Sequence, residues 1–186
     1  PNMPACQVGI SVNSHGPNNT LVLGDVSGPA ALIEAESYLS RGIADVVLVG
    51  ATGSRIGAAR MLYHRDSPAP KRDDRPIEQA SRPHDPNASG VVGGEGAASL
   101  VIETESHARK RGAVVLATVL ATASRFAPSS AVRSDQRSTE IEPQQSRSAA
   151  AAISLAVRAV LEQAEVNADQ IGLVVSHAMG DRQVDS

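Results

Sequence analysis

The stretch from Asn19 to Gly50 constrains the fold of this 186-residue chain more than any other segment. It begins with a short apolar run, Leu21–Leu23, which we expect to form a strand, followed by a turn of small residues. A helical pattern then extends from Pro29 to Ser40. Proline suits the first turn of a helix, and Gly42 stands where a helix would end.

The segment Ala44–Val49 completes this unit, because its continuous apolar run is typical of a fully buried strand. The order is therefore strand, turn, helix, strand. It places Asp25 at a sharp elbow just before a helix N-terminus, where backbone N–H groups and the helix dipole favour negative charge. Buried strands that alternate with helices predict an α/β fold.

The remaining chain continues this alternation. A proline-rich and charged stretch, Asp66–Ala80, predicts a surface loop that trypsin would cut first. The apolar patterns predict helices at Pro1–Val12, Ile56–His64, Glu105–Arg111 and Ser148–Ala164, and strands at Ala98–Glu103, Ala113–Ala123 and Leu173–Ser176.

Composition excludes several classes of protein. Hydrophobic residues make up 41% of the chain and aromatic residues 2%, so a core would consist of Ala, Val, Leu and Ile. The net charge of −3 argues against a nucleic-acid surface. A single cysteine excludes an intrachain disulfide framework, and no stretch is long enough for a membrane span. We expect a cytoplasmic location, and we expect an excised segment or a processed product because Pro1 is no natural initiator.

The elbow resembles the nucleophile region of the β-ketoacyl-acyl carrier protein synthases (ketosynthases). In that family a strand ends in a reactive Cys followed by a small residue, Ser or Thr, and Gly, and the helix runs to a Gly shortly before Ala-Asp-Val. Here Val26-Ser27-Gly28 fits the residues after the nucleophile, and Ala44-Asp45-Val46 fits the helix end without a gap. The resemblance therefore implies that Asp25 occupies the position of the catalytic cysteine.

A second block of resemblance lies between Arg82 and Ala97. The family has Arg-Pro-Phe-Asp, then Arg-Asp-Gly-Phe, then Gly-Glu-Gly-Ala leading into a strand. This chain keeps that frame at the same spacing but has His84 in place of Phe, and Ala88-Ser89 in place of Arg-Asp. The resemblance implies a structural loop that shapes the wall of an active site. Its matching residues are Arg82, Pro83, Asp85, Gly90, Gly94, Glu95 and Gly96.

The third block is Val174-Val175-Ser176-His177, which resembles the strand that delivers the first catalytic His of the family. That His polarises the thioester during decarboxylation, because a neutral imidazole offers an N–H donor. The following residues match the family poorly. The resemblance implies that the second catalytic His, the Lys and the Gly-Phe oxyanion segment would lie beyond Ser186.

The resemblance implies a thiolase-like α/β segment with a mixed buried sheet and packed helices. Residues 1–65 would form the nucleophile half, 66–80 a loop, and 81–186 the glycine-rich loop and the start of the second half. The function implied is that of a fatty-acid or polyketide ketosynthase relative without condensing activity, since a carboxylate replaces the thiolate. It implies an acyl carrier protein or acyl thioester as partner, a homodimer through Leu21–Leu23, and no cofactor or metal.

Three alternatives remain open from the sequence. The chain could be a non-catalytic partner subunit that resembles a chain-length factor, in which the nucleophile is also replaced. The glycines in Val46–Gly57 could begin a dinucleotide fingerprint, which would make the chain a nucleotide-binding reductase. Cys6 could be a nucleophile, although a lone cysteine is usually a small buried side chain.

Overall fold

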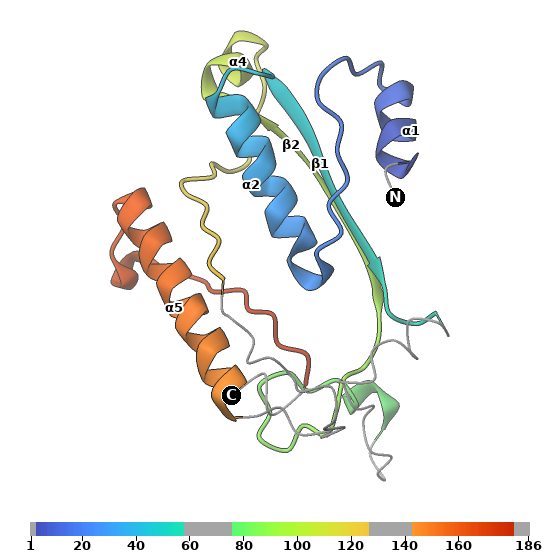
Figure 1. The fold of residues 1–186 in the computed structure, drawn as a ribbon, viewed down its shortest axis with the longest axis vertical. Helices are drawn as coiled ribbons and strands as arrows, with labels where there is room; N and C mark the ends of the chain where they lie inside the picture. Colours follow the sequence, from blue (N-terminus) through green and yellow to red (C-terminus); the bar gives the residue numbers. More distant parts are fainter. Residues whose placement is uncertain (1–2, 58–75, 127–142, 181–186) are drawn as a thin grey trace. The chain divides into compact units, whose positions relative to one another are not determined.

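The computed structural model describes residues 3–57, 76–126 and 143–180, with no side chains described for 143–149 (Figure 1). The predicted helix at Ile56–His64 and most of the predicted loop at Asp66–Ala80 fall outside these residues. The chain divides into two compact units. The first comprises Pro1–Gly53 and Gly96–Thr122, and the second comprises Ser54–Glu95 and Ala123–Ser186.

The first unit contains most of the regular structure. Its helices are α1 (Met3–Ser11), the 3-10 turn η1 (Gly24–Val26), α2 (Ser27–Ser40) and α4 (Glu105–Lys110), and it holds most of strands β1 (Val46–Ser54) and β2 (Glu95–Glu103). The described part of the second unit contains η2 (Ile77–Gln79), α5 (Pro143–Ala164) and η3 (Ala168–Gln170).

Strands β1 and β2 pair to form a two-stranded sheet. The C-terminal end of β1 lies beside the start of β2, since the Arg55 amide donates to the Gly94 carbonyl at 2.8 Å. The two strands therefore run antiparallel, and α2 runs alongside them in Figure 1. Gly28 of α2 permits this packing, because a Cβ there would lie 3.2 Å from the Cβ of Ala51 in β1.

Helices α2 and α4 each end at a glycine with a positive φ. Gly42 adopts a φ of 64° after α2, and its amide and that of Ile43 donate to carbonyls of the last helical turn, Leu39 and Tyr38. Gly112 does the same after α4 with a φ of 70°. The predicted ends of these helices are confirmed.

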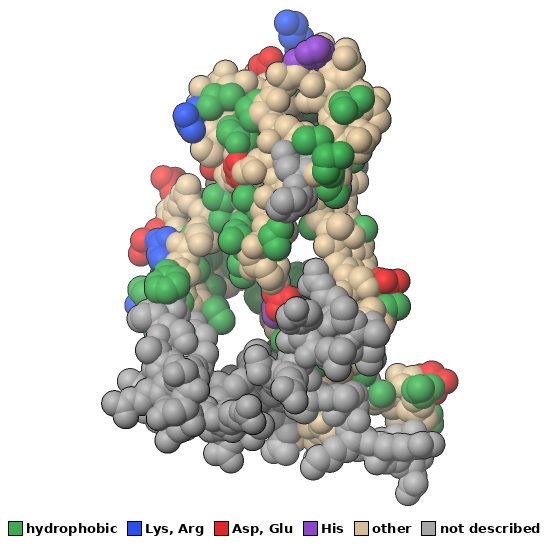
Figure 2. Space-filling view, turned by 45° about the vertical axis from the view of Figure 1, so that its right-hand side comes forward, with side chains coloured by type: hydrophobic (Ala, Val, Ile, Leu, Met, Phe, Trp, Pro, Cys, Tyr) green, Lys and Arg blue, Asp and Glu red, His purple; other side chains and the backbone are tan. Residues whose placement is uncertain are grey.

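Few apolar side chains are buried among the described residues. The buried ones are Ala35, Val49, Ala88 and Ala108, whereas Leu116 is 95% exposed and Val175 is 89% exposed. Figure 2 accordingly shows hydrophobic side chains on the surface. The expectation that Ala44–Val49 is fully buried is wrong for the described structure, because Val49 is the one buried position along β1. Burial requires layers on both faces of a strand, which sequence alone does not supply.

Three predicted strands are not strands in the described structure. Leu21–Leu23, Ala113–Ala123 and Leu173–Ser176 carry no regular structure there. Their apolar β-branched composition favours extended backbone, but a strand also needs a hydrogen-bonded neighbour, and in the described residues only β1 and β2 pair. No helix among these residues is long and apolar enough to cross a membrane.

Candidate functional site

The elbow that carries Asp25 is built by the hydroxyl group of Ser27. The Leu23 amide donates to Ser27 Oγ at 2.8 Å, and the same hydroxyl donates to the Gly24 carbonyl at 2.7 Å. Gly24 takes a φ of 64°, a left-handed conformation that glycine adopts without a steric penalty. Asp25 follows within η1 and is exposed, immediately before α2.

The segment that leads into the elbow is tied to α2 by side chains. Asn19 Nδ2 donates to both carboxylate oxygens of Glu34, at 3.0 and 3.2 Å, and the Tyr38 hydroxyl donates to the same carboxylate. The bond to Glu34 raises the pKa of Tyr38, because it and the nearby negative charge favour the protonated phenol. These bonds hold the segment before the elbow against Glu34, which lies two turns into α2.

The loop Arg82–Asn87 in the second unit is held by its own polar groups. Arg82 Nη1 lies 3.5 Å from Asp85 Oδ2, and its other terminal nitrogen donates to the Asn87 carbonyl. The Asn87 amide in turn donates to Asp85 Oδ1 at 2.7 Å. Pro83 is exposed between these groups. Arg82 and Asp85 therefore hold this loop together through its own polar groups.

The glycines of the second block have two different surroundings. Gly90 is buried, and a Cβ on Gly180 would lie 2.8 Å from the Gly90 carbonyl oxygen, so these backbones approach closely. Gly94 and Gly96 flank Glu95 at the start of β2, and a Cβ on either would meet open space. Glu95 Oε1 accepts a hydrogen bond of 2.6 Å from Ser54 Oγ, which joins the facing ends of the two strands.

The segment before His177 contacts the same loop. His84 Nε2 lies 2.8 Å from Ser176 Oγ, although the two residues are far apart in sequence. His84 has a φ of 60°, which is uncommon outside glycine. His177 follows Ser176 and is exposed. It belongs to the second unit, whereas Asp25 belongs to the first.

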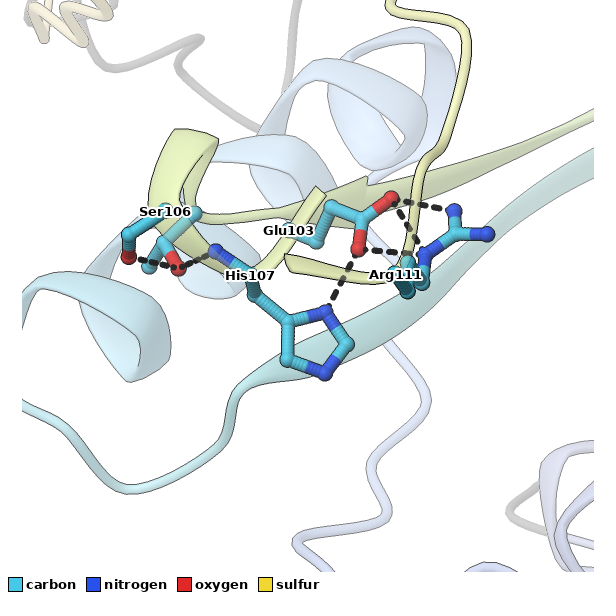
Figure 3. Close-up of polar contacts among 5 residues, drawn as sticks. Glu103, Ser106, His107 and Arg111 are labelled. Atoms are coloured by element: carbon cyan, nitrogen blue, oxygen red, sulfur yellow. Dashed lines mark hydrogen bonds and ion pairs between the residues drawn. The ribbon is translucent and has the colours of Figure 1, made fainter. Parts of the chain in front are cut away.

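A charged cluster joins β2 to α4 in the first unit (Figure 3). Glu103 Oε2 lies 2.6 Å from His107 Nδ1, and Arg111 donates to both oxygens of the same carboxylate. Glu103 is 10% exposed. The hydrogen bonds from Arg111 and then His107 lower the pKa of Glu103 to about 2, against the opposing effect of burial. Thr104 caps the start of α4 by accepting from the His107 amide at 3.3 Å.

The structure brings together some of the predicted residues and adds others. It joins Arg82 with Asp85, and it places the loop that holds them against the segment before His177. Ser27 was missed as the residue that builds the elbow, although a serine just before a helical pattern is a typical capping signal. Nothing in the sequence pairs His84 with Ser176, because that contact depends on tertiary structure.

The reading of Val46–Gly57 as a dinucleotide fingerprint is wrong. Such a fingerprint needs its glycines in a turn between a strand and a helix, where the backbone approaches a pyrophosphate. Gly50 and Gly53 instead lie inside strand β1. Cys6 lies in α1, where its thiol is 3.7 Å from Asn18 Oδ1.

Comparison with known proteins places these features in one family. The model of the β-ketoacyl synthase N-terminal domain matches residues 1–108. The chain is 37% identical over 129 residues to 3-oxoacyl-[acyl-carrier-protein] synthase 2 of Rhizobium meliloti, covering 64% of this chain and 28% of that protein. It is 30% identical to the putative polyketide β-ketoacyl synthase 1 of Streptomyces virginiae, over 100% of this chain and 41% of that protein.

Solved structures give the same result for the fold. One match is a chain from a solved structure described as a type II polyketide synthase acyl-carrier protein in complex with its ketosynthase. Its TM-score is 0.77 and its identity 20%, over 97% of this chain and 42% of the matched chain. The ishigamide ketosynthase/chain length factor matches with a TM-score of 0.52 and 22% identity, over 89% of this chain and 36% of that one. The predicted thiolase-like α/β fold is confirmed. The chain spans about two fifths or less of the length of these relatives.

Proposed function

The chain belongs to the β-ketoacyl synthase family, and on that premise we propose that it is a fatty-acid- or polyketide-type ketosynthase relative that does not itself condense acyl chains. The observation that carries the proposal is Asp25 at the apex of the elbow, between Gly24 and the start of α2. Condensation requires a soft thiolate that accepts an acyl group from a thioester. A carboxylate is a poorer nucleophile, and its acyl product would be a reactive anhydride.

Asp25 lies where a negatively charged side chain is favoured over a neutral acyl derivative. The side chain is exposed at the N-terminal end of a helix of 14 residues. The partial positive charge there stabilises an anion and lowers its tendency to form a neutral acyl derivative. We propose further that His177 occupies the position of the first catalytic His, whose role in the family is to polarise the thioester during decarboxylation.

The matched variant Asp25→Cys tests this proposal. Both proteins are incubated with an acyl-CoA and with an acyl-carrier-protein thioester, and the adduct is located by intact mass and peptide mapping. Wild type should carry no acyl group at residue 25, whereas the cysteine variant should acquire one slowly. A stable adduct on Asp25 in the wild type would show that the substitution does not abolish acyl transfer. Because Cys6 is also a thiol, the comparison is made in a Cys6→Ser background.

A non-catalytic partner subunit is the second candidate. The fold matches a structure described as a ketosynthase/chain length factor, which supports a role beside an active subunit. The complex of a ketosynthase with its acyl-carrier protein supports an acyl carrier protein as a partner of this chain. Co-purification with a catalytically competent ketosynthase, and a changed product length when the chain is added, would favour this candidate over an isolated inactive protein.

The organisation that goes with this function is also a proposal. Residues 1–65 would supply the nucleophile half, 66–80 a loop, and 81–186 the glycine-rich loop and the start of the second half, in a cytoplasmic homodimer. The dimer would form through Leu21–Leu23, where Val22 is 72% exposed and Leu23 is 54% exposed. Apolar side chains at such exposure favour a partner surface.

A further inference from the structure

The contact between Ser176 and His84 has the geometry of an activated nucleophile. The Ser176 Oγ to His84 Nε2 distance is 2.8 Å, inside the range in which an imidazole accepts the proton of a serine hydroxyl. Both residues are exposed, so a small acyl thioester can reach the hydroxyl. The pair belongs to the second unit, whereas Asp25 belongs to the first.

The two segments that carry the pair are held together by contacts other than the pair itself. Gly180 adopts a φ of 87°, and a Cβ there would lie 2.8 Å from the Gly90 carbonyl oxygen, so only glycine allows this approach. Arg55 reaches the same segment, with Nη1 2.9 Å from the Met179 sulfur, while its amide donates to the Gly94 carbonyl. The Gly180–Gly90 approach and the Arg55–Met179 contact therefore both help to place Ser176 beside His84.

The backbone of His84 supplies an independent observation. A φ of 60° is a left-handed conformation that disfavours side chains, yet this residue is a histidine where the ketosynthase pattern has phenylalanine. Unfavourable backbone conformations concentrate at functional sites, where the surrounding structure maintains them. Here that conformation accompanies an imidazole directed at a hydroxyl group.

We propose that Ser176 and His84 form a nucleophile–base pair that hydrolyses acyl thioesters. Ser176 Oγ attacks the thioester carbonyl carbon, the new C–O bond forms, and the C–S bond breaks. The serine proton passes to His84 Nε2 and then to the leaving thiolate. Water, deprotonated in turn by the same nitrogen, adds to the acyl carbon. The bond from that carbon to Ser176 Oγ then breaks, His84 returns the proton to Oγ, and a carboxylic acid is released. This activity needs neither Asp25 nor a thiolate, and it is separate from condensation.

The experiment uses the whole chain with the acetyl thioester of N-acetylcysteamine, and release of the thiol is followed colorimetrically. Wild type should hydrolyse the thioester above the protein-free rate. His84→Phe should reduce the enzymatic rate by about a hundredfold or more, which is the scale of a lost general base. Ser176→Ala, which removes the nucleophile, should reduce it at least as much. The matched control Ser40→Ala, at an exposed serine far from His84 in sequence, should stay within about twofold, since Ser40 donates only to the Ser37 carbonyl.

A covalent readout decides the question even if a variant fails to fold. Wild type is treated with a fluorophosphonate, digested with trypsin, and examined for the peptide 159–182, in which Ser176 is the only serine. Labelling at Ser176 supports the pair. Absence of labelling there, or hydrolysis equal to the blank, or a rate unchanged in folded Ser176→Ala, overturns it. None of these results alters the outcome at residue 25, so this proposal and the proposed lack of condensation can fail separately.

Discussion

At the scale of single residues, Glu103 makes the stability of the chain depend on pH. Arg111 and His107 lower the pKa of its carboxyl from 4.5 to about 2. Because the pKa is lower in the folded state, the stabilisation is complete above about pH 4.5 and is lost as the pH falls towards 2. Glu103→Gln should therefore destabilise the chain at neutral pH and flatten this part of the stability curve, as measured by urea unfolding across that pH range.

Glu105 offers the matched control for that measurement. Its ion pair with Arg109 lies within α4, but both side chains are mostly exposed, Glu105 at 70% and Arg109 at 77%. Exposed pairs of this kind contribute little to stability. Glu105→Gln should leave the pH dependence close to that of the wild type. Equal effects of the two substitutions would mean that the cluster in Figure 3 does not lock α4 to β2.

At the scale of elements, the glycine after α2 is required by the geometry of the helix end. Gly42→Ala places a Cβ on a residue with a φ of 64°, so it should destabilise the chain by about 1 kcal/mol. Gly50→Ala in β1 is the control, because its Cβ would meet no atom within 4 Å and it should be neutral or slightly stabilising. Thermal unfolding followed by circular dichroism compares them, and an equal loss in both variants would contradict this description of the cap.

Features set by neighbouring residues could be predicted from the sequence, whereas features that depend on distant segments could not. The ends of α2 and α4 were predictable because Gly42 and Gly112 act through the turn beside them. The strand predicted at Leu173–Ser176 is absent from the described structure, because pairing depends on a distant segment that composition does not identify. The elbow at Asp25 was recognisable from its spacing, whereas the partnership of His84 with Ser176 required the tertiary structure.

At the scale of the whole molecule, the proposed homodimer predicts an effect of charge at Val22. Val22→Asp should shift the chain towards monomer in sedimentation velocity at micromolar concentration, because a buried carboxylate without a partner disfavours the interface. Val12→Asp is the control, since Val12 is 57% exposed but lies outside Leu21–Leu23. A monomeric wild type, or a Val22→Asp dimer as stable as the wild type, would show that the interface lies elsewhere.

We propose that this member of the β-ketoacyl synthase family, with Asp25 at its elbow, does not condense acyl chains. The most direct test supplies an acyl-carrier-protein thioester together with malonyl-carrier protein and measures the β-ketoacyl product by mass spectrometry. We predict no product above the protein-free control, at any ratio of the two thioesters. Product that forms with the wild type and disappears in Asp25→Ala would contradict the claim.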